Sequence, residues 1–295
     1  MVFPTNKTAT LTGHNGACHC VTYSNGGQYV LTGGSDRKIH LYNPNTSTLI
    51  QKYEKGHGYE VLDIAVTHDN EKLGTVGGDR LALLWDVATA KTIRRFEGHG
   101  ARINTVGFNA DASVMVTGSF DATVRFWDLK SSGWKPIMIC EEAKDSVMGL
   151  KVGGWEVYTG SVDGHLRTYD LRMGTLVTDL VGYPITSLSL TTDSNGILVS
   201  TLDSHIRLFD KSTGSCLQTY TGGHVNKDYR IRSCIGGPGE AWVLTGSEDG
   251  KIVAYDLLEG REVASLKGQH GGKVVSAVGF HPRGKQWVSV GVDGE

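Results

Sequence analysis

The sequence lacks the features that mark several protein classes. Its five cysteines are odd in number and scattered, so they do not suggest a disulfide framework, and they favour a reducing compartment. No stretch approaches the roughly 18 apolar residues of a membrane-spanning helix, and the N-terminus carries no apolar signal-peptide core. The net charge is only −2, which gives no reason to expect nucleic acid or an anionic membrane as a partner.

Proline is also scarce, with six residues, whereas glycine is abundant, with 40 of 295. That glycine content is nearly twice the usual ~7% and predicts many tight turns rather than long helices. Hydrophobic residues make up 39% of the chain and charged residues 20%, which argues against disorder and against a coiled coil. A chain of this length suits either two ordinary domains or one large all-β domain.

An aspartate followed six residues later by an aromatic residue recurs along the chain. These pairs are Asp36 and Tyr42, Asp79 and Trp85, Asp121 and Trp127, Asp163 and Tyr169, Asp203 and Phe209, and Asp249 and Tyr255. Successive aspartates lie 40 to 46 residues apart, and Asp293 continues the series. A Gly-His pair stands upstream in four units, ending at His14, His57, His99 and His224. The fourth and fifth units have no such histidine, so we expect them to be the least firmly fastened.

Units of this length that contain an upstream Gly-His pair and an aspartate followed six residues later by an aromatic residue are typical of WD40 β-propellers. The chain resembles these propellers over its whole length. Because one unit cannot bury both of its faces alone, the units are expected to close into a ring. We therefore predict an all-β fold, a seven-bladed WD40 β-propeller with four-stranded blades, the last completed by the N-terminal strand at 8–11. The expected domain is a single propeller over 1–295, with the C-terminal strand of the last blade missing from the chain.

Longer segments resemble one WD40 family, the mitogen-activated protein kinase organizer scaffolds. The matching segments are Gly56–Asp63, Gly77–Ala88, Gly160–Gly174, Pro184–Thr186 and Leu202–Gly214. The generic repeat does not require Gly58–Glu60 or Leu171–Gly174, so these parts carry the family information. The resemblance implies a non-enzymatic scaffold, associated with assembled spliceosomes in the nucleus and with kinase-cascade organisation in the cytoplasm.

A histidine, a threonine, an aspartate and a tryptophan recur at equal spacing in the second and third units. The two sets are His57, Thr75, Asp79 and Trp85, and His99, Thr117, Asp121 and Trp127. Hydroxyl, imidazole and carboxylate are also the parts of a hydrolase triad, but an enzyme needs one such set at one pocket rather than copies in several units. Hydrogen bonds that link Asp to His, His to Thr and Thr to Trp would satisfy every buried member. We predict structural tetrads that resemble the family's hydrogen-bonded tetrad, with no catalytic residue, no metal site and no cofactor.

The turns that carry the key aspartates and the loops that lead into the first strand of each unit are predicted to share one face. Residues there have no repeat-wide structural role, so their variation can encode partners. Arginine and exposed aromatic residues are typical of interface anchors. The predicted partner-binding residues are Arg37, Tyr59, Glu60, Arg80, Arg102, Phe120, Arg230 and Lys273.

The predicted function is a monomeric, rigid platform that binds other proteins in a large assembly. The family resemblance favours a spliceosome-associated scaffold in pre-mRNA splicing, in the nucleus and cytoplasm, and a kinase-cascade scaffold is the alternative. A substrate receptor of a cullin–RING ubiquitin ligase is a third hypothesis, because Tyr169–Arg172 resembles the motif by which some WD40 proteins join these ligases. Lys227–Arg232 mixes basic and aromatic residues as RNA-binding segments do, so RNA is a secondary candidate partner and a membrane is not one.

Overall fold

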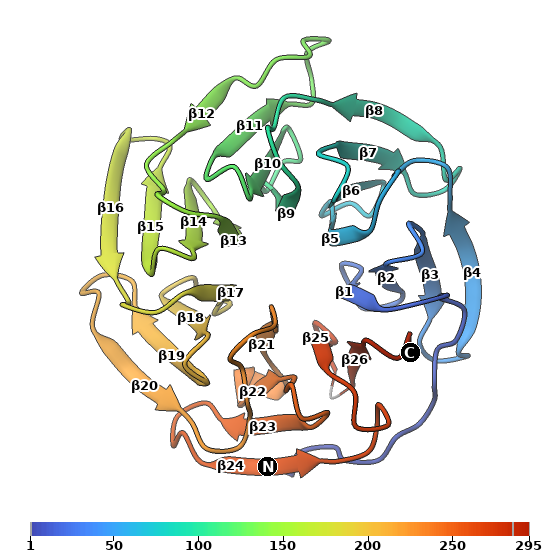
Figure 1. Cartoon of the computed structure of the whole chain (residues 1–295), viewed down its shortest axis with the longest axis vertical. Helices are drawn as coiled ribbons and strands as arrows, with labels where there is room; N and C mark the ends of the chain where they lie inside the picture. The colour runs from blue at the N-terminus through green and yellow to red at the C-terminus, as the bar shows by residue number, and fades with distance from the viewer. Residues whose placement is uncertain (1, 285, 295) are drawn as a thin grey trace.

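The computed structural model describes residues 2–284 and 286–294. Strands dominate this part of the chain, and its one helical turn is the 3-10 helix η1 (Pro238–Glu240). The strands form seven sheets arranged around a central channel, so the predicted all-β propeller architecture is confirmed (Figure 1). Within each sheet, strands that follow one another in sequence pair antiparallel.

Each sheet runs from the channel outwards. The strands next to the channel are β1 (Cys18–Tyr23), β5 (Val61–Val66), β9 (Ile103–Phe108), β13 (Val147–Gly153), β17 (Ile185–Leu190), β21 (Ser233–Gly236) and β25 (Val275–Phe280). The second strands are β2 (Val30–Gly34), β6 (Lys72–Gly77), β10 (Val114–Ser119), β14 (Glu156–Ser161), β18 (Gly196–Thr201), β22 (Trp242–Thr245) and β26 (Trp287–Gly291). The third strands are β3 (Ile39–Asn43), β7 (Ala82–Asp86), β11 (Val124–Asp128), β15 (His165–Asp170), β19 (His205–Asp210) and β23 (Ile252–Asp256). The outer strands are β4 (Thr48–Tyr53), β8 (Thr92–Phe96), β12 (Met138–Cys140), β16 (Thr175–Leu180), β20 (Cys216–Tyr220) and β24 (Glu262–Leu266).

The hydrophobic core lies between neighbouring sheets rather than at the centre of the molecule. One cluster joins Leu31 and Ile39 of the first sheet to Val61 and Trp85 of the second, and similar clusters follow around the ring. Burial of apolar surface between sheets is the main force that closes such a ring.

Glycine at the end of a second strand lets a turn approach the preceding loop. A Cβ on Gly77 would lie 2.2 Å from the carbonyl oxygen of Glu60, which is far inside contact distance. The absence of a side chain there allows the next amide, that of Gly78, to donate to the same Glu60 oxygen at 3.0 Å. Part of the high glycine content is therefore required by this recurring close approach.

The prediction of seven four-stranded blades is wrong, because only six of the sheets formed by the described residues have four strands. We number these blades 1 to 6 in chain order, from β1–β4 to β21–β24. In the seventh position, β25 and β26 form a sheet of two strands.

The expected closing strand at 8–11 is also absent, since these residues form no strand and join no sheet of the described chain. Figure 1 shows the segment before β1 following the outer rim. Side chains hold it there, because Phe3 stacks on Trp287 with ring centroids 5.9 Å apart and the Trp287 indole donates to the Pro4 carbonyl at 2.8 Å. A cavity, described below, separates the segment from β26, so backbone pairing between them does not occur.

Candidate interaction face

In blades 2 and 3 the structure brings together the four side chains of each predicted set. His99 Nδ1 lies 2.9 Å from Asp121 Oδ2, and His99 Nε2 lies 2.8 Å from Thr117 Oγ1. The Trp127 indole N–H donates to the same threonine hydroxyl at 2.9 Å. We call this arrangement the tetrad. The blade 2 tetrad has the same links at 2.8 to 2.9 Å and consists of His57, Thr75, Asp79 and Trp85.

The tetrad has the electrostatics of a structural element. Burial raises the pKa of Asp121, but hydrogen bonds from His99 and Thr123 outweigh burial and hold that pKa well below its usual range. Burial lowers the pKa of His99, so the imidazole is neutral at pH 7 and donates its Nδ1–H to the carboxylate. The Thr117 hydroxyl is fully buried and accepts from an indole, so it has no access to a substrate. The Gly100 amide also donates to Asp121 at 2.8 Å, and the tetrad thereby fastens the loop before β9 to its blade.

Blades 4 and 5 hold their turn aspartates with arginine instead of histidine. Arg167 Nη2 lies 2.7 Å from Asp163 Oδ2, and its Nη1 donates to Ser161 Oγ at 2.6 Å. We call this arrangement the Arg–Asp clamp. The corresponding side chains in blade 5 are Arg207, Asp203 and Thr201.

Sequence reasoning missed the clamp, although an arginine follows the aspartate by four residues in both units that lack the histidine. The carboxylates of blades 4 and 5 are therefore fully bonded, contrary to the reason for expecting weak fastening there. In blade 4, burial raises the pKa of Asp163, but bonds from Arg167 and Ser161 outweigh burial and hold that pKa well below its usual range.

Blade 1 keeps part of the tetrad but has tyrosine in place of tryptophan. His14 bridges Asp36 and Thr32 at 3.0 and 2.7 Å, while Tyr42 Oη lies 3.0 Å from His40 Nδ1. His14, Asp36 and His40 place possible metal-ligand atoms within 4.8 Å of one another. Both His14 nitrogens are already engaged with Asp36 and Thr32, so the three residues do not present a ready metal site.

Blade 6 rearranges the network further. His224 Nδ1 lies 2.8 Å from Tyr255 Oη, and Asp249 pairs with Lys251 rather than with the histidine. The buried Nε2 atom of His224 has no hydrogen-bond partner in the described part of the chain. Burial lowers the pKa of His224 to about 4. Blade 6 therefore contains a buried neutral imidazole that is only half satisfied.

The aspartate-bearing turns and the loops that lead into each innermost strand share one face, as the repeat pattern predicts. In six of the seven sheets of the described chain, the amide just after the second strand donates to the carbonyl of the residue just before the innermost strand, at 2.8 to 3.0 Å. In the sheet β21–β24, the Glu248 amide of the turn after β22 donates at 2.9 Å to Val225, which lies earlier in the long loop before β21. These donor and acceptor pairs are Ser35 and Ala17, Gly78 and Glu60, Phe120 and Arg102, Val162 and Ser146, Leu202 and Pro184, Glu248 and Val225, and Val292 and Val274. We call the turns and lead-in loops together the interaction face.

Most of the predicted partner-binding residues lie exposed on this face. Tyr59 and Phe120 expose 63% and 50% of their surface, which is unusual for large aromatic side chains. The Arg102 guanidinium carbon lies 4.8 Å above the centre of the Phe120 ring, so the two side chains form one cation–π pair. Arg37, Arg80 and Lys273 are also exposed, and Glu60 is half-buried.

Arg230 does not belong to this exposed set. Its guanidinium points into the channel, where Nη1 donates to the Asn104 carbonyl at 2.7 Å and Nη2 donates to the Met148 carbonyl. The loop before β21 turns the side chain inwards because three amides of residues 227–229 bind one oxygen of Glu248. The same packing leaves Tyr229 on the interaction face, where 53% of its surface is exposed. Tyr229 is the aromatic residue of the suggested RNA-binding segment.

Sequence reasoning also missed Tyr183 on the loop that leads into β17. This side chain is 48% exposed, and the Arg207 guanidinium carbon lies 5.4 Å from its ring centre. The signal available in the sequence is an aromatic residue directly before Pro184, at the position of the lead-in loop.

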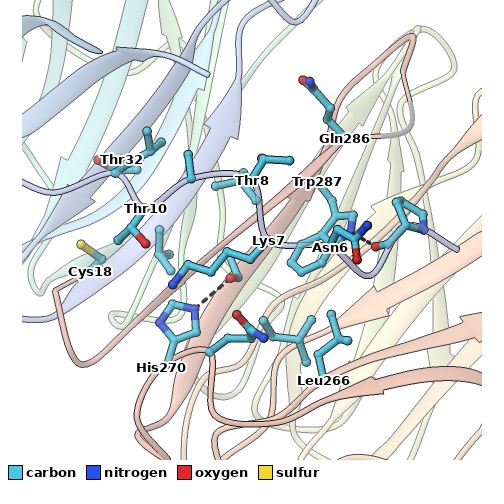
Figure 2. A pocket seen from close by; sticks show the side chains of 18 of the residues that line it. Asn6, Lys7, Thr8, Thr10, Cys18, Thr32, Leu266, His270, Gln286 and Trp287 are labelled. Atoms are coloured by element: carbon cyan, nitrogen blue, oxygen red, sulfur yellow. Dashed lines mark hydrogen bonds between the residues drawn. The ribbon is translucent and has the colours of Figure 1, made fainter. Parts of the chain in front are cut away.

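A second candidate site is the cavity between the N-terminal segment and β26, which we call the N-terminal groove. It has a volume of about 250 Å³ and is lined by residues 4–11 on one side and by residues 286–290 on the other. Figure 2 shows Lys7 and Thr10 of the segment facing the same space as His270 and Trp287. His270 bonds Ser289 Oγ at 2.8 Å and Asp293 at 2.8 Å, so three members of a tetrad-like set line or adjoin this groove without an aromatic donor.

None of the described residues forms a helix long and apolar enough to cross a membrane.

Comparison with known proteins identifies the repeat and its relatives. The family described as "WD domain, G-beta repeat" matches residues 5–43, 90–128 and 214–256. WD repeat domain-containing protein 83 of Homo sapiens is 43% identical over 95% of this chain and 87% of its own length. Its homolog in Dictyostelium discoideum is 33% identical over 96% of this chain and 94% of its own. An uncharacterized WD repeat-containing protein of Schizosaccharomyces pombe is 39% identical over 93% of this chain.

Proposed function

The chain belongs to the family of WD repeat domain-containing protein 83, the mitogen-activated protein kinase organizer family, and on that basis we propose that it is a non-enzymatic scaffold of the pre-mRNA splicing machinery. WD40 propellers generally mediate protein–protein interactions and are not catalysts. The assignment to splicing rests on the family resemblance of Gly58–Glu60 and Leu171–Gly174. A scaffold that serves spliceosomes works in the nucleus, and a second pool in the cytoplasm accompanies a signalling role.

The observation that carries the scaffold proposal is the chemistry of the interaction face. Tyr59, Arg102 and Phe120 are exposed on loops that the blade 2 and blade 3 tetrads hold in place. Aromatic and arginine side chains on a rigid support have the composition and the low ordering cost of interface anchors. We propose that these residues, with Arg37, Arg80 and Lys273 around them, dock another protein of a large assembly.

The alternative function is a scaffold for a mitogen-activated protein kinase cascade, which the same face would serve. A substrate receptor of a cullin–RING ligase is the less favoured third candidate. Arg172, the key residue of that hypothesis, is exposed on the turn between β15 and β16, at the opposite face of the disc. RNA would be a secondary partner through Tyr229 and its neighbours.

Affinity purification followed by mass spectrometry tests these proposals. The wild-type chain is expected to capture splicing factors, and the triple variant Tyr59→Ala, Arg102→Glu, Phe120→Ala is expected to lose them with an almost unchanged melting temperature. A matched control, Lys130→Glu, Trp155→Ala, Leu258→Ala, changes one cation and two exposed apolar residues in turns of the opposite face.

Kinases alone in the wild-type eluate would replace the splicing proposal by the signalling one, and cullin adaptors alone would replace it by the ligase proposal. If the triple variant keeps every partner while the control loses them, the docking surface lies on the opposite face.

A further inference from the structure

Two arginines from the loop before β21 cross the central channel. Arg230 donates from Nη1 to the Asn104 carbonyl at 2.7 Å and from Nη2 to the Met148 carbonyl. Arg232 Nη1 lies 2.5 Å from Asp63 Oδ1. Because these acceptors belong to β9, β13 and β5, which lie next to the central channel in Figure 1, the two guanidinium groups brace the ring from the inside.

A cavity of about 300 Å³ lies in the channel beside these arginines. Its lining comes from the later parts of the innermost strands, such as 105–108 of β9 and 187–189 of β17. Those parts lead into the turns on the side away from the interaction face, whereas Arg230 and Arg232 reach the cavity from the loop before β21. The charged side chains in its lining are those of Asp63, Lys151, Arg230 and Arg232.

The positive charge in this cavity is not balanced. Asp63 is already paired with Arg232, and it also accepts from the Val106 amide at 3.0 Å. The hydrogen bonds of Arg230 go to neutral carbonyl groups, and no carboxylate in the described part of the chain pairs with Lys151. Burial lowers the pKa of both Arg230 and Lys151, and the nearby Arg232 cation adds to this effect. Two cations therefore remain without a counter-charge in the channel, where Lys151 is exposed and Arg230 is half-buried.

We propose that the channel cavity binds a small oxyanion of the phosphate class, held mainly by Lys151 and Arg230. A dianion would neutralise the two unmatched cations, and a cavity whose charged lining is mainly positive concentrates anions. The planar guanidinium group of arginine can donate two parallel hydrogen bonds to phosphate oxygens, and lysine adds a flexible point charge. The cavity has room for one or two phosphate groups but not for a folded chain. This site stands or falls independently of the partners that the interaction face binds.

Calorimetric titration of the purified chain with inorganic phosphate and with pyrophosphate tests the proposal, with sodium chloride of equal ionic strength as the blank. Wild type should bind, and Lys151→Gln should weaken binding about tenfold or more, as expected for the loss of one charge-assisted contact. Lys130→Gln, which changes an exposed lysine on the loop between β11 and β12, should leave the affinity unchanged. Because Lys151 has no ion-pair partner, Lys151→Gln should melt at the wild-type temperature or above it in phosphate-free buffer.

Titration with a phosphoserine peptide distinguishes the two sources of the anion. Inorganic phosphate that binds with Lys151 dependence, while the peptide does not, identifies a free anion as the ligand. A peptide that binds with the same Lys151 dependence identifies a phosphorylated protein segment, and both results support the site. Absence of binding by every probe, or equal binding by wild type and Lys151→Gln, would overturn the proposal.

Discussion

Blades 3 and 5 have an aspartate at the same position of the turn, but its carboxylate accepts hydrogen bonds from different groups. In blade 3, Asp121 accepts from the His99 imidazole and from the Gly100 amide, and both donors belong to the lead-in loop. In blade 5, Asp203 accepts from Arg207, which lies four residues further along its own blade. Every blade must hydrogen-bond its buried carboxylate, but the tetrad also uses that requirement to fasten a loop of the interaction face.

The consequence is an interaction face with two kinds of support. Tyr59 and Arg102 stand on loops that the tetrads of blades 2 and 3 tie to their turns. Tyr183 stands on the blade 5 loop, where no described amide of that loop donates to Asp203 and the Val181 and Gly182 amides donate to the Gly164 carbonyl instead. We expect the first pair to be held stiffly in the free protein and Tyr183 to be held less firmly.

The largest effect should come from breaking the clamp of blade 4. Asp163→Ala leaves the Arg167 guanidinium, whose side chain is 4% exposed, buried without a counter-charge. We expect the free energy of unfolding to fall by about 3–5 kcal/mol, measured by urea denaturation. The double variant Asp163→Ala, Arg167→Met removes the stranded charge and should recover much of the loss. A single variant as stable as wild type would contradict the view that the clamp matters.

Breaking the tetrad of blade 3 should lower the free energy of unfolding somewhat less than breaking the clamp of blade 4. Asp121→Ala strands the buried His99 imidazole and removes the acceptor of the Gly100 and Thr123 amides, but it strands no permanent charge, so we expect a loss of about 2–4 kcal/mol. Thermal and urea melts of this variant and of Asp163→Ala, recorded together, give the ranking. An unchanged melt for Asp121→Ala would refute a structural role for the tetrad, and a larger loss than for Asp163→Ala would reverse the comparison.

Acid should weaken blade 6, which contains the buried imidazole of His224. Burial lowers the pKa of His224 from 6.5 to about 4, so the folded protein binds this proton less readily than the unfolded chain. The stability that comes from the neutral His224 is therefore fully present above pH 6.5 and is lost as the pH falls towards 4. At pH 5 the free energy of unfolding has fallen by about 2 kcal/mol from this cause.

His224→Phe removes this group, so the difference in unfolding free energy between pH 7 and pH 5 should shrink by about 2 kcal/mol. His68→Phe, at an exposed position, is the control and should leave the difference unchanged. A His224→Phe variant with the wild-type pH dependence would show that another group is responsible.

The smallest effect on stability should come from the exposed cation–π pair. Arg102→Ala removes the contact with Phe120 at the surface, so we expect the free energy of unfolding to change by less than about 1 kcal/mol. The same variant should reduce partner capture, because arginine anchors contribute to binding rather than to folding in this account. A large loss of stability would mean that the Arg102–Phe120 pair stabilises the folded propeller rather than serving mainly in binding.

The repeat pattern predicted the parts of the fold that each unit determines by itself. The 22-residue spacing of His99 and Asp121 places them at the two ends of one loop–strand–strand path, so their contact follows from the sequence. The clamp was not predicted because Arg167 lies within a strand pattern that every unit shares. Its pairing with the turn aspartate matters in this unit because the upstream histidine, which binds that aspartate in other units, is absent.

Features that depend on several units were not predictable in this way. The inward turn of Arg230 depends on Glu248, a residue of the next turn, and on acceptors in three other blades. The number of four-stranded sheets depends on where residues 4–11 lie relative to β26, which side-chain anchoring by Phe3 and Trp287 decides.

Hydrogen exchange of the free protein at pH 7 shows whether the tetrad of blade 3, unlike the clamp of blade 5, fastens its lead-in loop. We expect slower amide exchange at Gly58 and Gly100, which donate to tetrad aspartates, than at Tyr183 in the blade 5 loop. We also expect Asp121→Ala to accelerate exchange at residues 99–101 and Asp203→Ala to leave residues 181–184 unchanged. Equal exchange in the two loops, or acceleration of the blade 5 loop by Asp203→Ala, would show that the tetrad has no special role in fastening its loop.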